Sequence, residues 1–394
     1  MSNNNWTMVT LGEVSSEETT RLGKSITNYP IYGVDRSVGL TTTPKYVGKS
    51  LSRYKRLLPG MFAYNPMRLN IGSIGYCSKK HEAGLVSPDY VVFSCDESRL
   101  DPEFLSHYIK SFFWRNWTEG SGIGSVRVRI YYDELSQMPI ELPPISEQRA
   151  IARILGTLEE KITLNRQINE TLESITQSIF KSWFIDYDPV RAKTEGCDSC
   201  LSKDISDLFP DSFENSEFGH IPKGWEIKKI GDILNRLPAS VTYNKDQVEP
   251  DGKTPVFEQG AGVLLGYHNE TAQISATHDD PAFIFGDHTC VTRLSCEPFD
   301  VSQNVIPLKG SDRSTFWVYY AVRDKQTFQE YRRHWMELIY KEVVVPKPDI
   351  CETFSRIASP IQMRIEANLR QSQTIALIRD TLLPQLMSGQ IRVR

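Results

Sequence analysis

Apolar side chains recur at alternating intervals of three and four residues in two long stretches of this chain, and that spacing is typical of an amphipathic helix. The first stretch includes Ile151, Leu155, Leu158, Ile162, Asn165, Ile168, Leu172, Ile175 and Ile179. The second includes Ile357, Ile361, Ile365, Asn368, Ile375, Ile378 and Leu382. A narrow stripe sustained over several heptads, with one Asn within it, is typical of a coiled coil. We therefore expect one long helix over residues 146–185, and a second long helix followed by a C-terminal tail over residues 351–394.

The two stripes match each other when the first is shifted by 203 positions, which superimposes Ile162 on Ile365 and Asn165 on Asn368. Equivalent helices can bury both stripes against each other; the alternative is that each helix lies on its own domain. We expect an antiparallel pair in which the Asn residues fix the register at some cost in stability. The predicted seam of this pair consists of Leu158, Ile162, Asn165, Leu172, Ile361, Ile365, Asn368 and Ile375.

The segments that precede the two helices also repeat each other. Trp6 opens the run WTMVTLGEV and Trp225 opens WEIKKIGDIL, while PIYG at 30–33 is matched by PVFE at 255–258. Both segments contain short β-like runs separated by turn residues. We expect an α+β fold of two similar β-rich heads, residues 1–145 and 222–350, separated by two long helices that pair as an antiparallel coiled coil. The whole chain would then be a pseudo-two-fold internal repeat.

An acidic segment lies between the first helix and the second head. Residues 182–221 carry nine acidic and three basic side chains, a net charge of −6 against −4 for the whole chain. The total charge therefore neither supports nor excludes nucleic-acid binding, and local basic groups must decide. Because residues 186–221 are also rich in Asp, Ser and Pro, we expect them to form a hinge between the two halves.

Composition limits the compartment and the cofactors. Hydrophobic residues make up 40% of the 394 positions, which is enough for sizeable cores. The N-terminus has no basic region followed by an apolar run, and no stretch reaches the ~18 apolar residues of a membrane span. Of the seven cysteines, Cys197 and Cys200 alone have CxxC spacing. We expect a cytoplasmic protein without contact to a membrane, with no structural zinc and no catalytic residues.

Basic and amide side chains lie close to glycines in both heads. Arg, Lys, Asn and His can hydrogen bond to base edges or phosphates, and glycine allows the backbone to approach a groove closely. The candidate DNA contacts of the first head are Arg36, Arg53, Arg56, Asn65, Arg68, Lys79 and Lys80. Those of the second head are Lys253, His268, Asn269, His288, Arg293, Arg332 and Arg333. The heads differ in sequence, so two half-sites read by them would also differ.

Four motifs resemble the DNA specificity subunit (S subunit) of type I restriction-modification systems. They are LPPISEQ at 142–148, FKSWFIDYDPV at 180–190, GHIPKGW at 219–225 and LLPQLMSG at 382–389, so the resemblance covers essentially the full chain. It implies that each head is a target recognition domain that reads half of a bipartite site in double-stranded DNA. It also implies that the helix pair sets the length of the unread spacer.

The same resemblance implies protein partners and assigns cofactors to them. Two copies of a DNA adenine methyltransferase (M) subunit would dock on the helices, and restriction/translocase (R) subunits would join the full complex. S-adenosylmethionine, ATP and Mg²⁺ would then be bound by the partner subunits and none by this chain. The candidate partner-binding residues are Gln148, Arg149, Arg153, Trp183, Phe184, Arg356, Leu383, Leu386 and Met387. For Trp183 and Phe184, packing against the adjoining helix is the favoured interpretation, and it need not exclude docking of a partner.

Two alternatives remain at this stage. Asp211, Glu226 and Lys228 have the spacing of a metal-dependent nuclease, in which carboxylates hold Mg²⁺ and Lys assists water. A regulator that binds a split operator without enzyme partners is the other. One departure from the repeat also matters, because the second boundary, VVVPKPDICETFSRI at 343–357, lacks the Ser-Glu-Gln sequence of the first.

Overall fold

The computed structural model describes residues 5–23, 28–36, 39–120, 129–260, 262–330 and 332–393. The chain divides into two compact units, one made of residues 1–164 and 371–394 and the other of residues 165–370. Two 40-residue helices, α4 (Ile145–Phe184) and α10 (Pro348–Met387), each contribute to both units. The helix α4 begins and ends one residue before the predicted bounds, whereas α10 begins three residues early and leaves residues 388–393 as a tail.

The first unit contains a strand pair and two four-stranded sheets. The strand β1 (Thr7–Thr10) pairs antiparallel with β10 (Pro139–Leu142). One sheet has the order β2-β9-β6-β7, with β2 at Ser15–Glu17, β9 at Val91–Cys95, β6 at Phe62–Tyr64 and β7 at Ile74–Tyr76. The other has the order β4-β3-β8-β5, with β4 at Gly39–Thr41, β3 at Ile31–Asp35, β8 at Gly84–Val86 and β5 at Lys55–Leu57. Three short helices follow, α1 (Pro102–Tyr108), α2 (Phe112–Gly120) and α3 (Tyr132–Leu135).

The second unit repeats this strand order. The strand β13 (Glu226–Lys229) pairs with β21 (Glu342–Val345), as β1 pairs with β10. A four-stranded sheet has the order β14-β20-β17-β18, with β14 at Leu234–Arg236, β20 at Val305–Gly310, β17 at Ala282–Gly286 and β18 at Thr292–Ser295. A three-stranded sheet has the order β16-β15-β19, with β16 at Leu264–His268, β15 at Thr254–Phe257 and β19 at Asp300–Val301. Its helices are α7 (Ile230–Ile233), α8 (Thr315–Val322) and α9 (Trp335–Ile339).

One parallel strand pair in each head makes the repeat specific. The strands β3 and β8 are parallel in the first head, and β15 and β19 are parallel in the second, although every other strand pair found in the described residues of the two heads is antiparallel. Each parallel pair lies next to an antiparallel hairpin of the same sheet, β3–β4 in the first head and β15–β16 in the second. The two heads therefore share their strand order, except that the sheet β16-β15-β19 has no strand equivalent to β5 among the described residues, and the internal repeat expected from the sequence is present in the fold.

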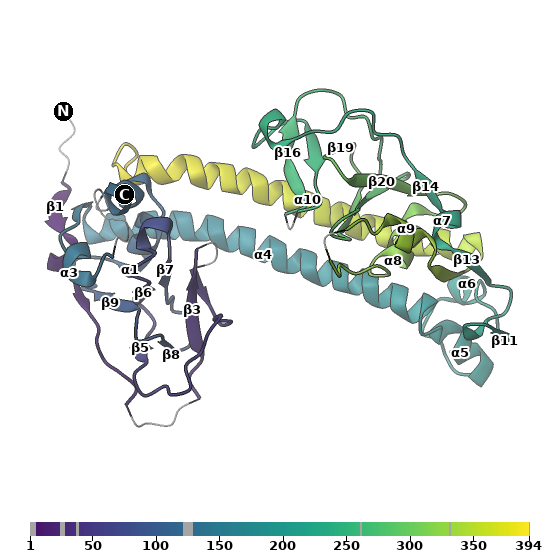
Figure 1. Cartoon of the computed structure of the whole chain (residues 1–394), viewed down its shortest axis with the longest axis horizontal. Coiled ribbons are helices and arrows are strands. Elements are labelled where there is room, and N and C mark those ends of the chain that lie inside the picture. Colours follow the sequence, from purple (N-terminus) through teal and green to yellow (C-terminus); the bar gives the residue numbers. More distant parts are fainter. Residues whose placement is uncertain are drawn as a thin grey trace. The chain divides into compact units, whose positions relative to one another are not determined.

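The two long helices run antiparallel where they meet inside the second unit (Figure 1). The Asn165 side-chain amide donates to the carbonyl of Asn368 at 3.3 Å, and the Asn169 amide donates to the carbonyl of Ile365 at 3.2 Å. As α4 advances by one turn, its partner on α10 recedes by about one turn, which fixes the antiparallel direction. Asn165 and Asn368 are both buried, so the polar positions of the two stripes do meet.

The apolar seam departs from the predicted stripe toward the end of α4. Ile175 is 44% exposed, whereas its neighbour Thr176 is buried and bonds its hydroxyl to the carbonyl of Leu172 at 3.1 Å. Phe180 is buried one turn later. The same happens on α10, where Ile378 is 44% exposed. The buried face therefore follows a straight helix of 3.6 residues per turn and drifts away from a strict heptad.

Residues 186–221 fold onto the second head and do not form a hinge. They contain α5 (Asp188–Glu195), α6 (Lys203–Ser206) and the hairpin of β11 (Phe213–Ser216) with β12 (Gly219–Pro222). Val190, Phe209 and Ile221 are buried, and the first two belong to the main core of the second unit. The acidic side chains lie mostly on the outside of this segment. The acidic composition therefore predicted a hinge, although three apolar side chains anchor the segment by burial.

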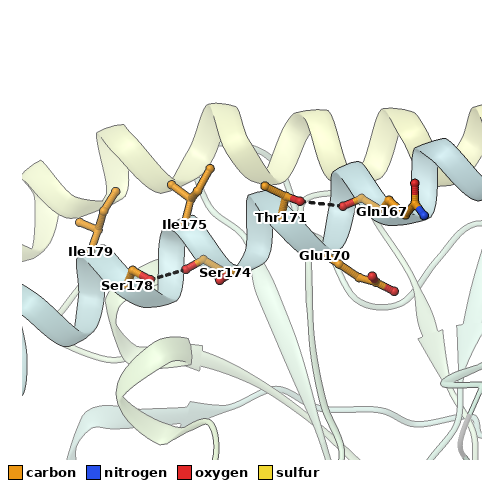
Figure 2. Close-up of a pocket in the computed structure, with 7 residues that line it drawn as sticks. All are labelled: Gln167, Glu170, Thr171, Ser174, Ile175, Ser178 and Ile179. Atoms are coloured by element: carbon orange, nitrogen blue, oxygen red, sulfur yellow. Dashed lines mark hydrogen bonds between the residues drawn. The ribbon is translucent and has the colours of Figure 1, made fainter. Parts of the chain in front are cut away.

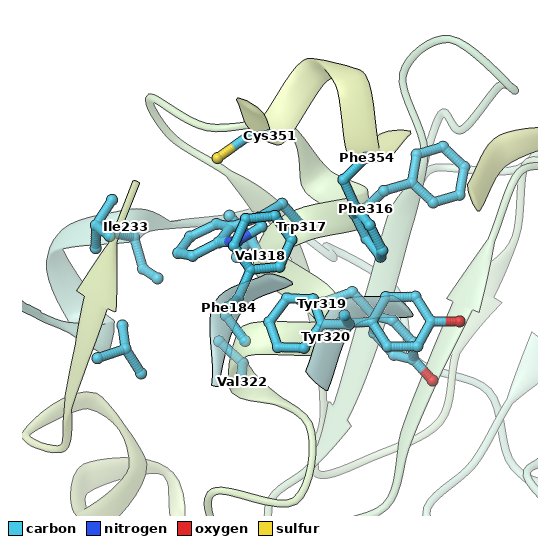
Figure 3. Close-up of a cluster of buried hydrophobic side chains, with 14 of the residues drawn as sticks. Phe184, Ile233, Phe316, Trp317, Val318, Tyr319, Tyr320, Val322, Cys351 and Phe354 are labelled. Atoms are coloured by element: carbon cyan, nitrogen blue, oxygen red, sulfur yellow. The ribbon is translucent and has the colours of Figure 1, made fainter. Parts of the chain in front are cut away.

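Each unit has its own main core. In the first, residues of both long helices, Ile151 and Leu155 of α4 and Leu386 and Met387 of α10, join the head. In the second, aromatic side chains from α4, α8 and α10 form one cluster, which includes Phe184, Trp317 and Phe354 (Figure 3). Within the part of the chain that the structure describes, no helix combines the length and apolarity needed to cross a membrane.

Candidate nucleic-acid interface

A short turn between β6 and β7 presents two candidate side chains of the first head, Asn65 and Arg68. The Asn65 side chain accepts the backbone N–H of Met67 at 3.0 Å, and the carbonyl of Arg68 accepts that of Ser73 at 3.0 Å. Gly72 has a φ of +87°, a conformation that side chains other than glycine rarely adopt. These bonds hold Arg68 at an exposed tip between Met67 and Ile71, which are 52% and 51% exposed. A cation flanked by apolar groups suits a base edge with its methyl group.

A groove of about 920 Å³ opens beside this turn within the first unit. Its walls are the β3–β4 hairpin, the 69–76 turn and the faces of α1 and α2. The side chain of Arg36 passes over Gly72, at which a Cβ atom would lie 3.9 Å from the Arg36 Cγ. Lys110 and Arg115 also line the groove and were missed by the sequence analysis, because nothing in α1 and α2 places them beside glycines until the chain folds.

The first head keeps most of its candidate cations free of internal ion pairs. Lys80 is the exception, because its ammonium lies 2.6 Å from Glu160 of α4. Among the residues with described positions, no carboxylate lies within ion-pair distance of Arg36, Arg53, Arg56, Arg68 or Lys79, and all five are exposed. A polyanion could therefore approach these five without displacing an internal partner.

Two candidate arginines of the second head, Arg332 and Arg333, are in ion pairs with carboxylates of the same head. Arg332 lies 2.8 Å from Glu337 and 3.1 Å from Glu330, and Arg333 lies 3.8 Å from Asp287. All of these pairs are partly solvated, so each is weak and exchangeable. Lys253 and Asn269 are exposed neighbours, joined by a 3.3 Å hydrogen bond from the Lys253 backbone to the Asn269 side chain. They form the freer part of the candidate surface in this head.

The structure corrects the assignment of His268. Its ring is buried, stacks on Tyr243 with ring centres 4.4 Å apart, and accepts the backbone N–H of Glu270 at Nδ1. With Nδ1 an acceptor, Nε2 carries the proton and donates to Asp300 at 2.9 Å. Both ring nitrogens are used inside the head, which assigns His268 a structural part there in place of the predicted DNA contact.

Arg293 and His288 are also less available than predicted. The Arg293 guanidinium lies over the Phe257 ring at 5.1 Å, and burial lowers its pKa. His288 is half-buried, and its backbone N–H donates to the Gln259 side chain at 3.0 Å. Both residues shape the β17–β18 hairpin more than its outer surface.

Five of the nine candidate partner-binding residues are inside the protein. Trp183 and Phe184 are 4% and 3% exposed and pack with Phe354 in the second unit (Figure 3). Leu386 and Met387, the residues 203 positions after them, are buried in the first unit. These pairs therefore play the same structural part in the two repeats, which answers the open question about Trp183 and Phe184 in favour of packing.

Gln148 is the fifth buried candidate, and its hydrogen bonds explain its burial. Its side-chain oxygen accepts the backbone N–H of Asp101 at 2.9 Å, and its amide donates to the carbonyls of Arg99 and Pro143, both at 2.9 Å. Leu383 is half-buried. Arg149, Arg153 and Arg356 remain exposed on the helices and are the accessible members of the predicted set.

The outer face of α4 in the second unit carries a shallow groove that the sequence analysis did not identify. Ile175 and Ile179 lie on one side of it and Ser174 and Ser178 on the other (Figure 2). The hydroxyls of Thr171 and Ser178 bond to carbonyls one turn earlier, at 2.9 and 2.8 Å, which leaves the groove smooth and only weakly polar. A surface of this kind suits contact with another protein.

The carboxylates of the nuclease hypothesis do not gather around one point. Lys228 lies 3.1 Å from Glu226 and 3.1 Å from Asp312, while the Asp211 side chain accepts the hydroxyl of its neighbour Ser212 at 3.0 Å. Across the described ranges, neither Asp211 nor Glu226 belongs to a group of three ligating side chains able to hold a metal ion. The geometry therefore gives no support to that hypothesis.

Comparison with known proteins identifies the family of these motifs. Residues 3–174 match the type I restriction modification DNA specificity domain. The chain is similar to type I specificity subunits over most of its length. It is 23% identical to the type I restriction enzyme HindI specificity subunit of Haemophilus influenzae, over 86% of this chain and 88% of that protein. It is 24% identical to the MjaIX specificity subunit of Methanocaldococcus jannaschii, over 74% of this chain and 69% of the relative.

The solved structure of a type I S subunit from M. genitalium has the same fold. Its TM-score is 0.58 at 15% sequence identity, and the match covers 98% of this chain and 97% of the other. The fold class expected from the sequence is therefore confirmed, as is the resemblance to type I specificity subunits.

Proposed function

We propose that this chain is the DNA-specificity subunit of a type I restriction-modification complex. Each head would read one half of a bipartite asymmetric site, and the paired helices would set the unread spacer and dock the M subunits. The observation that carries the proposal is one topology used twice with different exposed side chains. A repeated scaffold with divergent surfaces is what two readers of unlike half-sites require.

The free cations of the first head support a DNA contact there. Five exposed basic side chains without internal carboxylate partners would each neutralise a phosphate or read a guanine edge, and each good bidentate base contact is worth about 1–3 kcal/mol of discrimination. The groove beside Arg36 and the apolar tip around Arg68 add shape to this charge.

Partner binding would use the exposed faces of the long helices. Arg149, Arg153 and Arg356 are accessible there, and the Ile175 groove adds an apolar strip on α4. We propose two M subunits per chain, with R subunits joining for cleavage, all working in the cytoplasm. This chain would catalyse no step itself, and S-adenosylmethionine, ATP and Mg²⁺ would act on the partner subunits.

Co-expression with an M subunit of the same type, followed by sequencing of methylated bases in host DNA, tests the proposal. We expect methylation at one split, asymmetric site. Replacing residues 1–140 by the same domain of a relative should change one half-site and leave the other unchanged. A change in both half-sites, or methylation without any sequence preference, would contradict the proposal.

A single-residue series adds resolution to the same assay. The variant Arg68→Ala should relax one base position if the side chain reads a base, or weaken binding to all sequences and reduce the salt dependence if it contacts phosphate. Lys203→Ala, an exposed cation in the acidic segment, is the matched control and should change neither. An identical methylation pattern and salt dependence for Arg68→Ala would remove that residue from the interface.

A further inference from the structure

Three potential metal ligands converge in the second unit. The ligand atoms of His278, Cys296 and Glu366 all lie within 4.8 Å of one another. His278 comes from the loop before β17, Cys296 follows the last residue of β18, and Glu366 is on α10. The three are far apart in sequence, which is why a search for ligand spacing along the chain found nothing here.

The polar atoms of this cluster are incompletely bonded. Glu366 is 7% exposed, and its Oε1 accepts the backbone N–H of Cys296 at 2.8 Å and the amide of Gln362 at 3.2 Å. Its Oε2 and the Nδ1 of His278 are both buried and have no hydrogen-bond partner among the described residues. An unsatisfied buried carboxylate oxygen costs a few kcal/mol, so native structures normally give it a partner.

A divalent cation would satisfy these atoms. Imidazole, thiolate and carboxylate together are a set that zinc favours, with bond lengths of about 2.0–2.3 Å. Such lengths put tetrahedral ligands about 3.3–3.8 Å apart, so separations below 4.8 Å need only small side-chain movements. Three protein ligands would leave one position for water.

The surrounding charges do not replace such an ion. The charge of Glu366 acts on Arg293, but the two do not form an ion pair within the described part of the chain, and Glu297 beside Cys296 is paired with Arg370 of α10. Burial raises the pKa of Glu366 and of the Cys296 thiol. Binding of a cation would release the thiol proton of Cys296 as the sulfur–metal bond forms.

We propose that His278, Cys296 and Glu366 form a zinc site that fastens the second head to α10. The ion would join the β17 loop and the end of β18 to a helix that otherwise meets them through packing, hydrogen bonds and the Glu297–Arg370 ion pair. The site would stabilise the head and hold its orientation on that helix. This proposal does not depend on the proposed function and revises the expectation that no metal is bound.

Cobalt titration of the metal-free full-length chain tests the site, because thiolate ligation gives Co²⁺ a charge-transfer absorption and visible bands. The exposed Cys197 and Cys200 could bind cobalt on their own, so the reference protein carries Cys197→Ser and Cys200→Ser. We expect one Co²⁺ per chain, displaced by Zn²⁺, and a higher Tm with zinc. Absence of thiolate absorption in this reference protein would overturn the proposal.

Two variants locate the ion. Glu366→Gln keeps the shape of the side chain and should weaken metal affinity about tenfold or more, and Cys296→Ser should abolish the charge-transfer absorption. Cys290→Ser changes a half-buried thiol of the same hairpin outside the cluster and should leave binding unchanged. Should Cys296→Ser fail to fold, the Glu366→Gln titration decides, and an affinity equal to that of the reference protein would refute the site.

Discussion

His107 is a buried histidine at the junction of α1 and α4 in the first unit. It is 4% exposed, and burial lowers its pKa to about 4; Glu159, at 3.9 Å, opposes that shift, while Lys110 and Arg379 add to it. The folded protein therefore holds His107 neutral at pH 7. The unfolded chain, with an ordinary histidine pKa near 6.5, takes up a proton as the pH falls.

This difference predicts a loss of stability in mild acid. Between pH 7 and pH 5 the unfolded state binds a proton that the folded state does not, so the free energy of unfolding should fall by up to about 1.4 kcal/mol per pH unit below 6.5. Denaturant unfolding at several pH values measures the slope. In His107→Gln the slope over this range should be smaller, and an unchanged slope would assign the effect to other groups.

Glu147 anchors the C-terminal tail to the first head. Its carboxylate lies 2.6 and 2.8 Å from two nitrogens of Arg392 and accepts the indole N–H of Trp6 at 3.3 Å. The hydrogen bond from Arg392 is the main reason that the pKa of Glu147 is lowered. Because the folded pKa is depressed, the stabilisation is present above the normal glutamate pKa and is lost as the pH falls through the folded value.

Replacing Glu147 should therefore destabilise the first unit. Glu147→Gln leaves Arg392 without its carboxylate and should lower the free energy of unfolding of the first unit by about 1–3 kcal/mol. Denaturant unfolding at pH 7 measures the change. Glu160→Gln is the matched control, since its pair with Lys80 is exposed on both sides and should be worth less than about 1 kcal/mol. Equal shifts for the two variants would show that the tail contact adds nothing.

Buried polar residues were the least predictable part of the sequence. Glu147 and Gln148 look like a helix start in the motif ISEQ, yet both turn inward and bond to distant backbone or to Arg392. The second repeat has Ile350 and Cys351 at these positions, and both are fully buried. The missing Ser-Glu-Gln of the second boundary thus reflects an apolar solution to the same packing problem, which only the three-dimensional neighbours reveal.

At the scale of elements, the C-terminal end of each long helix packs against the tryptophan that opens a head. Phe184 lies 6.0 Å from the ring of Trp225, the residue that opens the second head. In the first unit, the ring of Trp6 lies within 3.4 Å of the position that a Cβ atom would take at Gly389, two residues after α10. Each entry tryptophan therefore packs on the C-terminal end of the helix from the other repeat.

Two substitutions on α4 distinguish residues that stabilise the second unit from residues that would dock a partner. Phe184→Ala should cost about 3–5 kcal/mol in the second unit, because it empties a fully packed aromatic site. Ile175→Asp, on the exposed groove of α4, should change the Tm little but should reduce co-purification with the M subunit. Thermal unfolding and co-purification measure the two effects, and the reverse result for either variant would contradict its assignment.

The apolar spacing along the chain predicted the two long helices, because a helix is specified by residues close together in sequence. The helix bounds followed from the stripe, and the matched Asn165 and Asn368 followed from one shift of the sequence. Strand order did not follow, because the parallel β3–β8 pair joins segments about 50 residues apart, with nothing in either strand to specify its partner. The fold of residues 186–221 was missed since three apolar anchors are hidden among nine acids.

At the scale of the whole molecule, the repeat separates what is kept from what is free to vary. Both heads keep the strand order, the parallel pair and the entry tryptophan. Their outer side chains differ in identity and in ion pairing, since the first head has free cations whereas Arg332 and Arg333 of the second are paired with carboxylates. Binding by the second head should therefore depend more on exchanging internal ion pairs for phosphate.

The boundary between the two units falls after Leu164 on α4 and after Arg370 on α10. Inserting seven residues at both points would preserve the apolar stripe and leave each unit's residues intact. At 1.5 Å per residue the insertion adds about 10 Å, or about three base pairs of B-DNA. If the helix pair is the spacer, the methylated site should lengthen by that amount while both half-sites stay the same. Five residues instead turn the stripe by about 140° and should prevent assembly, because the seam no longer faces its partner. An unchanged spacing after the seven-residue insertion would mean that something other than the helix pair measures the distance between half-sites.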